Sequence, residues 1–217
     1  MKEGDFVEIE YKGRIALTNE IFDLTSAEQA KKEGIFNEKI KYGPVFVIIG
    51  ANMTIKGVEK QLETMKINDE KEFTVKPEQA FGNRIPKLIK IVSLSKFIEQ
   101  KINPVPGIFV NIEGMQAKVQ SVSGGRVRVD FNHPLAGKEL KYNVKIVKQY
   151  TTTDEKLKVL LNHYNIKAKT ELKEGKLTID PEKPVNNFLE KLVSDTIKKW
   201  INDIKEVDFV KKEEPKK

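Results

Sequence analysis

The chain has 217 residues, of which 39% are hydrophobic and 33% are charged, a composition typical of a globular protein. It contains no cysteine, which excludes disulfides, thiol nucleophiles and thiolate metal sites. No run approaches the roughly 18 apolar residues of a membrane-spanning helix, and the amino terminus lacks the apolar segment of a secretory signal. We therefore expect a cytoplasmic protein. Its abundant lysine and glutamate resemble the composition of thermophile proteins, although the base composition of the genome gives the same bias.

The first part of the chain reads as strands with short helices. Residues 6–17, FVEIEYKGRIAL, alternate apolar and polar side chains, which predicts a strand with a bend at Gly13. Thr25 and Glu28 then have the spacing of a capping box and Gly34 is a helix stop, so a short helix is expected. KYGPVFVIIG predicts a strand, TIKGVEKQLETM a short amphipathic helix, and INDEKEFTV a further strand.

The character of the sequence changes at about residue 85. Apolar residues alternate on both sides of Gly124 and Gly125, which predicts a hairpin because glycine accepts the positive φ of a tight turn. KELKYNVKIVKQY then predicts a strand again, so a piece with its own hairpin separates two parts of one sheet. This pattern indicates an inserted subdomain. Residues 85–131 carry seven lysines and arginines against three acids, which fits a solvated basic face better than nucleic-acid binding.

A third unit begins at TTTDEKLKVLLNHYN, where Thr152 and Glu155 have capping-box spacing. Two strand-like pieces flank Gly175, and Pro184 is expected at the start of a long helix. VDFV then predicts a short strand, and KKEEPKK is a charged tail. The long helix carries an apolar stripe for about five turns. This stripe needs a partner, either the unit's own sheet or a second copy of the chain in a homodimer through residues 151–217. Its residues are Val185, Phe188, Leu189, Leu192, Val193, Ile197, Trp200, Ile201 and Ile204.

The sequence has no motif of covalent or metal chemistry: there is no P-loop, dinucleotide fingerprint, nucleophile elbow or HExxH. No metal and no cofactor are expected. Apolar and aromatic residues do occur at strand ends and at the short helix, beside the lone carboxylate Asp23. Such a set suits chemistry that breaks no covalent bond, although aromatic residues on an alternating strand are more often core. The residues are Tyr11, Phe22, Val45, Ile55, Phe81 and Tyr142.

The chain has two histidines, His133 and His163. His133, in FNHPLAGKEL, could act as a base, a metal ligand or part of a chain reversal, and Pro134 with Gly137 favours the reversal. This turn is the place where the inserted piece returns the chain to the first sheet. His163 lies off the apolar stripe of its helix and is expected at the surface.

The order of these motifs resembles the FKBP family of peptidyl-prolyl cis/trans isomerases. The resemblance rests on VEIEYKGRI…IFD and on FVIIGANMTIKGVEKQLETMKINDEKEFTVKPEQAFG; it covers residues 6–83 and resumes at 136–149. MQAKVQSVSGGRVRVDFNHPLAGKEL is similar to the insert-in-flap chaperone subdomain of SlyD-like members of the long archaeal type. An α+β fold is expected, with a half-barrel antiparallel sheet wrapped on a short helix, a mostly β insert and a C-terminal α+β domain. The expected domains are 1–84 with 132–150, then 85–131, and 151–217.

The resemblance also implies a substrate pocket. Tyr11 and Asp23 would share a hydrogen bond. Asp23 could be catalytic, or it could serve only as the hydrogen-bond acceptor of the Tyr11 hydroxyl. The Ile55 N–H would bind a substrate carbonyl. Val58 stands where the family often has tryptophan, so the side chain at the floor of the pocket is smaller and the pocket is deeper or shaped differently. Phe81 stands where tyrosine is common, so one hydroxyl is missing from the pocket. The implied catalytic residues are Tyr11, Phe22, Asp23, Ile55, Phe81 and Tyr142, with Val45, Thr54, Val58, His133 and Leu135 as further substrate contacts.

The function that the resemblance implies is acceleration of X-Pro isomerisation during protein folding, with the insert holding unfolded chains. The alternative is a holdase chaperone that keeps an inactive FKBP pocket. The expected partners are unfolded proteins and proline-containing peptides, and neither a specific nucleic acid nor a membrane. The expected chaperone surface consists of Ile89, Ile91, Val92, Phe97, Ile108, Phe109 and Met115.

Overall fold

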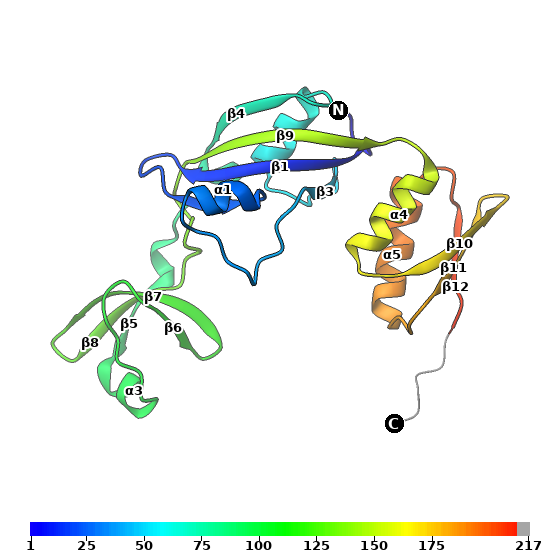
Figure 1. The fold of residues 1–217 in the computed structure, drawn as a ribbon. Helices are drawn as coiled ribbons and strands as arrows, with labels where there is room; N and C mark the ends of the chain where they lie inside the picture. Colours follow the sequence, from blue (N-terminus) through cyan, green and yellow to red (C-terminus); the bar gives the residue numbers. More distant parts are fainter. Residues whose placement is uncertain (212–217) are drawn as a thin grey trace. The chain divides into compact units, whose positions relative to one another are not determined.

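The protein has an α+β fold with three β-sheets, seen in a computed structural model that describes residues 1–211 (Figure 1). The described residues form two compact units. The first unit contains residues 1–14, 21–73 and the chain from Tyr142 onward, and the second contains residues 15–20 and 74–141.

The first sheet has the order β2-β1-β9-β4, with β3 paired to β1. Both β2 and β3 run antiparallel to β1. The alternation predicted for β1 is seen in its burial, since Phe6 and Ile9 are fully buried. The strands are β1 (Phe6–Ile15), β2 (Ile21–Leu24), β3 (Val45–Ile48), β4 (Glu70–Val75) and β9 (Leu140–Tyr150), and the helices are α1 (Ala27–Lys32) and α2 (Lys56–Thr64).

The predicted cap of α1 is wrong by one residue. Ser26, and not Thr25, is the N-cap, and its side chain accepts a hydrogen bond from the Gln29 N–H. The Thr25 hydroxyl is occupied elsewhere: it accepts from the Tyr11 N–H at 2.9 Å and bonds the Tyr11 carbonyl at 3.3 Å. Thr25 therefore ties the start of α1 to β1, which local spacing could not reveal.

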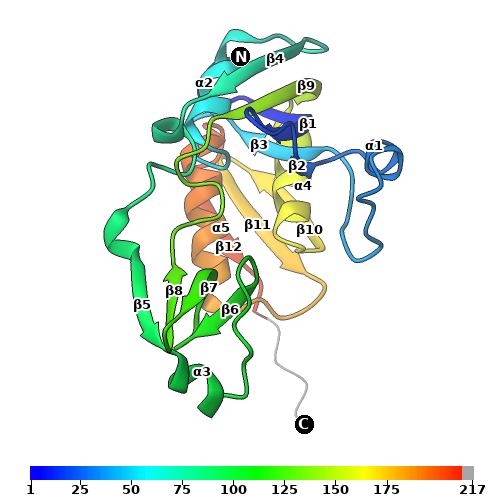
Figure 2. The same cartoon turned by 90° about the vertical axis from the view of Figure 1, so that its left-hand side faces the viewer.

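The second sheet lies in the second unit, with the order β5-β8-β7-β6 and antiparallel pairing throughout (Figure 2). Gly124 and Gly125 have φ of 54° and 71° at the β7–β8 turn, which confirms the predicted hairpin. Phe97 of α3 lies in the core of this subdomain and is 2% exposed, so its place on a chaperone surface was wrong. The elements are η1 (Pro77–Gln79), η2 (Pro86–Leu88), β5 (Ile89–Ser93), α3 (Leu94–Glu99), β6 (Phe109–Ile112), β7 (Met115–Ser123) and β8 (Arg126–Asp130).

A carboxylate joins the chain leaving for this sheet to the chain returning from it. Asp130, at the end of β8, accepts hydrogen bonds from Arg84, Gln120 and Asn132. The Asn132 side chain in turn bonds both the N–H and the carbonyl of Ile85. Burial raises the pKa of Asp130, but the hydrogen bonds from Asn132 and Arg84 outweigh it, and the pKa lies below its usual value. Asp130 is thus an ionised clasp between residues 84–85 and 130–132.

The third sheet has the order β10-β11-β12, in which β11 and β12 are parallel. The predicted capping box of Thr152 and Glu155 is present at the start of α4. The long helix begins at Asn187, and not at Pro184, because the Asn186 side chain caps it by accepting from the Leu189 N–H. The elements are α4 (Thr153–His163), β10 (Ala168–Lys173), β11 (Lys176–Pro181), α5 (Asn187–Trp200) and β12 (Glu206–Phe209).

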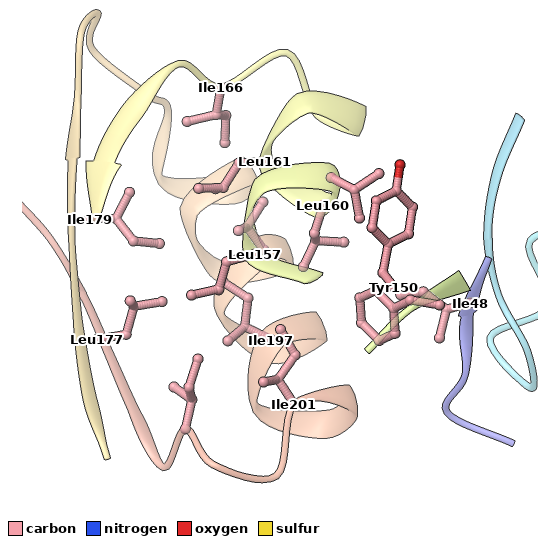
Figure 3. Packing of buried hydrophobic residues seen from close by; sticks show 14 of the residues in the cluster. Ile48, Tyr150, Leu157, Leu160, Leu161, Ile166, Leu177, Ile179, Ile197 and Ile201 are labelled. Carbon is pink, nitrogen blue, oxygen red and sulfur yellow. The ribbon is translucent and has the colours of Figure 1, made fainter. Parts of the chain in front are cut away.

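The apolar stripe of α5 is covered in part within the chain, although Phe188 and Leu192 stay exposed. Val193 and Ile197 are fully buried and pack with α4 residues against Leu177 and Ile179 of β11 (Figure 3). The same cluster reaches the first sheet through Phe6, Phe46, Ile48 and Tyr150. At this junction the Tyr150 hydroxyl donates to Glu8 at 2.7 Å, and the Lys156 ammonium lies 5.4 Å from the centre of the Phe6 ring.

The expected domain limits, at residues 84, 131 and 150, remain predictions. The tail KKEEPKK lies outside the described residues from its second lysine onward. In residues 1–211, no helix has the length and apolar character needed to cross a membrane.

The burial of the α5 stripe predicts unequal costs for two substitutions on one helix. Ile197→Ala should lower the free energy of unfolding by about 2–5 kcal/mol, because it opens a cavity in the cluster. Phe188→Ala should change it by no more than about 0.5 kcal/mol, because Phe188 is 79% exposed. Urea denaturation followed by circular dichroism measures both, and equal losses would contradict the packing described.

Candidate functional site

An aromatic cluster in the first unit is centred on Tyr142 of β9. Its ring lies 6.1 Å from that of Tyr11 on β1, 5.7 Å from Phe22 on β2 and 6.3 Å from Phe73 on β4, measured between ring centres. These separations are in the range that aromatic pairs prefer. Tyr142 is 7% exposed, whereas Tyr11 and Phe22 are half-buried. Four strands of the first sheet therefore present one aromatic surface.

Gly13 is required for the position of Phe22. A Cβ atom at Gly13 would lie 2.5 Å from the Phe22 ring, closer than non-bonded carbons approach. The expected bend is present as a register shift between Gly13 and Arg14. The glycine thus has two roles: it allows the irregularity in β1, and it leaves room for the tip of the Phe22 ring.

A single carboxylate lies at the edge of the cluster. The Tyr11 hydroxyl donates a hydrogen bond to Asp23 Oδ2 at 2.6 Å, as the resemblance implied. Burial, and then this hydrogen bond and the charge of Asp23, raises the pKa of Tyr11 far above its usual range. Burial and the same charge raise the pKa of Tyr142 to about 12. Both phenols are therefore neutral at physiological pH and cannot serve as bases.

The residues expected as further walls lie on β3 and at the start of α2. Val45 begins β3 and is 38% exposed, and Thr54 and Ile55 precede α2, with Ile55 as its N-cap. Val58, the expected floor, is 4% exposed. The first N–H groups of a helix have no partner within it, which leaves this end able to bind a carbonyl oxygen.

A buried acid shapes the loop before α2. Glu59, 8% exposed, accepts hydrogen bonds from the Gly50 and Asn52 N–H groups at 2.9 and 3.1 Å. Asn52 has a φ of 54°, and the bond to Glu59 helps to hold that left-handed conformation. Glu59 therefore fixes the backbone that leads to Thr54 and Ile55.

The remaining candidates lie in the second unit. The rings of Phe81 and His133 are stacked with centres 4.2 Å apart and an angle of 2° between them. The Leu135 N–H donates to His133 Nδ1 at 3.2 Å, so Nδ1 is an acceptor in this conformation. The predicted chain reversal is present, since the Ala136 N–H bonds the His133 carbonyl and Gly137 has a φ of 74°. His133 thus makes a turn and supports Phe81.

The structure brings the candidates together in two groups. Tyr11, Phe22, Asp23 and Tyr142 are in contact in the first unit, and Phe81, His133 and Leu135 are in contact in the second. The sequence analysis missed two further residues, Phe73 and Glu59, and it also missed the close approach of the Phe22 ring to Gly13. The alternation in EKEFTV placed Phe73 on one face of a strand, but it could not show which ring Phe73 meets. His163 is exposed, as expected.

The site consists of aromatic rings, backbone groups and one carboxylate. Within residues 1–211, no cluster of three or more histidine, aspartate or glutamate side chains is placed to hold a metal ion. Such a site can bind an apolar group and orient an amide.

Sequence comparisons assign the chain to a family. The FKBP-type isomerase SlyD of Helicobacter pylori is 29% identical over 156 residues, covering 66% of this chain and 83% of the relative. A short-type peptidyl-prolyl cis-trans isomerase of Methanocaldococcus jannaschii is 32% identical over 146 residues, covering 67% of this chain and 92% of the relative. The chain belongs to the FKBP family of peptidyl-prolyl cis/trans isomerases.

This FKBP chain also matches one family model over residues 90–135 and is similar to a further isomerase. Residues 90–135 match the family described as "FKBP26, IF domain", and they contain β6, β7 and β8 entirely. An FKBP-type 16 kDa isomerase of Escherichia coli is 27% identical over 137 residues, covering 61% of this chain and 87% of the relative. The match to an IF domain falls on the segment that the sequence predicted to be inserted.

Proposed function

We propose that this FKBP chain accelerates X-Pro isomerisation in unfolded proteins at the aromatic site around Tyr142, while the sheet of residues 89–130 holds those chains nearby. The observation that carries the proposal is the cluster of Tyr142, Tyr11 and Phe22 beside a single hydrogen-bonded carboxylate. Its substrates are unfolded proteins and proline-containing peptides.

The chemistry needs no group that moves a proton. Rotation about an X-Pro bond crosses a barrier of about 18–20 kcal/mol because the planar amide has partial double-bond character. A twisted amide loses that resonance and its charge separation, so an apolar aromatic site favours the twisted form over the planar one. Catalysis depends on this difference in binding. Rings such as Tyr142 and Phe22 would contact the proline, and the Ile55 N–H would hold a carbonyl.

Phe81, His133 and Leu135 are also proposed as substrate contacts, as are Val45, Thr54 and Val58. The stacked His133 would keep the Phe81 ring in one orientation, which lowers the entropy lost on binding. Asp23 would orient the Tyr11 hydroxyl, and whether it also acts on the substrate electrostatically is tested by Asp23→Asn. The cluster as a whole is proposed to act through shape and polarity.

The insert is proposed to supply the chaperone activity through its exposed apolar residues. Ile91 is 68% exposed, Met115 52%, Phe109 46% and Ile108 39%, and Ile89 is half-buried. Val92 packs partly against the subdomain core, and Phe97 lies within it, so neither belongs to this surface. Holding a client near the site raises the effective concentration of its prolines.

The runner-up is a holdase that binds unfolded chains and leaves X-Pro bonds unchanged. The same exposed side chains of the insert support it. The homodimer through residues 151–217 also stays a proposal, for which Phe188 and Leu192 are the apolar residues of the α5 stripe left exposed. Light scattering on the chain with and without residues 151–217 measures the oligomeric state, and a monomer mass for the full chain would contradict the homodimer.

The proposed mechanism predicts that rings matter more than hydroxyls. Phe81→Ala and Tyr142→Ala should lower kcat/KM on a short proline peptide by about tenfold or more, whereas Tyr142→Phe should stay within about threefold. Phe188→Ala is the control for loss of an aromatic ring outside the site. A large loss in Tyr142→Phe would contradict a purely apolar role, and unchanged activity in both alanine variants would favour the holdase.

Removal of the insert should separate the two activities. With residues 85–131 replaced by a short Gly-Ser linker, turnover of short peptides should stay within about threefold, while catalysis of proline-limited refolding should fall by roughly tenfold or more. A protease-coupled peptide assay and refolding fluorescence measure the two. Equal losses on both substrates would contradict this division of labour.

A further inference from the structure

The outer face of the insert sheet combines exposed apolar side chains with cations. Val127 and Val129 of β8 are buried in the subdomain core, so the alternate residues Arg126 and Arg128 point to the opposite face. Ile91 of β5 is the direct cross-strand partner of Arg128 and therefore shares this outer face. Ile91 is 68% exposed, and Arg126 and Arg128 are exposed as well.

The same face continues across β7 to β6. Lys118 pairs with Asp130 on one side and with Phe109 on the other, which places all three on the outer face. The Lys118 ammonium lies 5.8 Å from the centre of the Phe109 ring, and Phe109 is 46% exposed. The outer face therefore carries apolar side chains on the edge strands β5 and β6 and cations on the central strands β8 and β7.

The outer face has almost no free negative charge. Asp130 is the carboxylate among its paired strand residues, and hydrogen bonds from Arg84, Gln120 and Asn132 occupy it. It is 8% exposed. Two of the chain's four arginines, Arg126 and Arg128, lie here, and arginine binds carboxylates in a two-pronged geometry that lysine cannot match.

We propose that this face selects unfolded segments in which apolar residues adjoin aspartate or glutamate. The inference rests on the proposed chaperone function and names its substrate class. Ile91 and Phe109 would take the apolar side chains of an extended segment, and Arg126, Arg128 and Lys118 its carboxylates. Charge complementarity of this kind speeds association and rejects basic segments.

A polypeptide fits the face better than a nucleic acid does. Proteins that bind single strands stack successive bases on several aromatic rings. Here the paired residues of the outer face include one ring, Phe109, and Lys118 already lies over it. The aliphatic Ile91 suits a hydrophobic side chain.

The test compares three fluorescein-labelled peptides with the same apolar residues and no proline, separated by Asp/Glu, by Ser/Gln or by Lys. Fluorescence anisotropy with the full chain should give the tightest binding for the acidic peptide and the weakest for the lysine peptide. In R126Q/R128Q the acidic preference should fall by roughly 3- to 10-fold, as expected for two exposed charge pairs, with the Ser/Gln peptide unchanged. The preference should also weaken as salt is raised.

A matched control removes two cations from other parts of the same subdomain. K87Q/K96Q, in η2 and α3, should keep the acidic preference. Equal affinities for the acidic and Ser/Gln peptides on the unaltered chain would overturn the proposal, as would equal losses in the two double variants. Tighter binding of an oligo-dT strand that displaces the acidic peptide would also overturn it, in favour of nucleic acid.

The outcomes separate this inference from the proposed function. If no peptide of any charge binds, the holding activity itself fails, and the charge preference with it. If all three peptides bind alike, only the charge preference fails. Unchanged binding of the Ser/Gln peptide by R126Q/R128Q, together with an unchanged circular dichroism spectrum, checks that the subdomain of the variant is folded.

Discussion

The proposed isomerase site depends on the packing of the Tyr142 ring against three other aromatic rings. The Tyr142 ring touches rings from β1, β2 and β4, and the strand that carries it, β9, lies between β1 and β4 in the sheet. β9 is added only after the chain has passed through the whole insert, so the first sheet cannot close until the insert has returned the chain. The aromatic cluster therefore depends on a strand, β9, that follows the insert in the chain.

This topology explains why the insert is clasped at its base. The outgoing residues 84–85 and the returning residues 130–132 are joined through Asp130 and Asn132, and the turn at His133 follows at once. The stacked pair of Phe81 and His133 thus belongs to the same two segments that enter and leave the insert.

The sequence predicted most elements because their signals are local. Alternation predicted β1 and β9, Gly124-Gly125 predicted the hairpin, and Thr152 with Glu155 predicted a true capping box. The errors come from distant contacts. Thr25 had the spacing of a helix cap, yet its hydroxyl accepts a hydrogen bond from the N–H of Tyr11 on β1. Phe97 looked like an exposed apolar residue, but the packing of α3 buries it. Phe73 was missed because its partner, Tyr142, lies on a strand that arrives far later in the chain.

We propose that this FKBP chain twists X-Pro bonds at the Tyr142 site without moving a proton. Two-dimensional NMR exchange spectroscopy on a short proline peptide, with a substoichiometric amount of the full chain, tests it directly. The account predicts cis–trans exchange cross-peaks within a second, against tens to hundreds of seconds without catalyst, at a rate that is flat across neutral pH. Absence of cross-peaks, or a rate that follows the titration of one group, would contradict it.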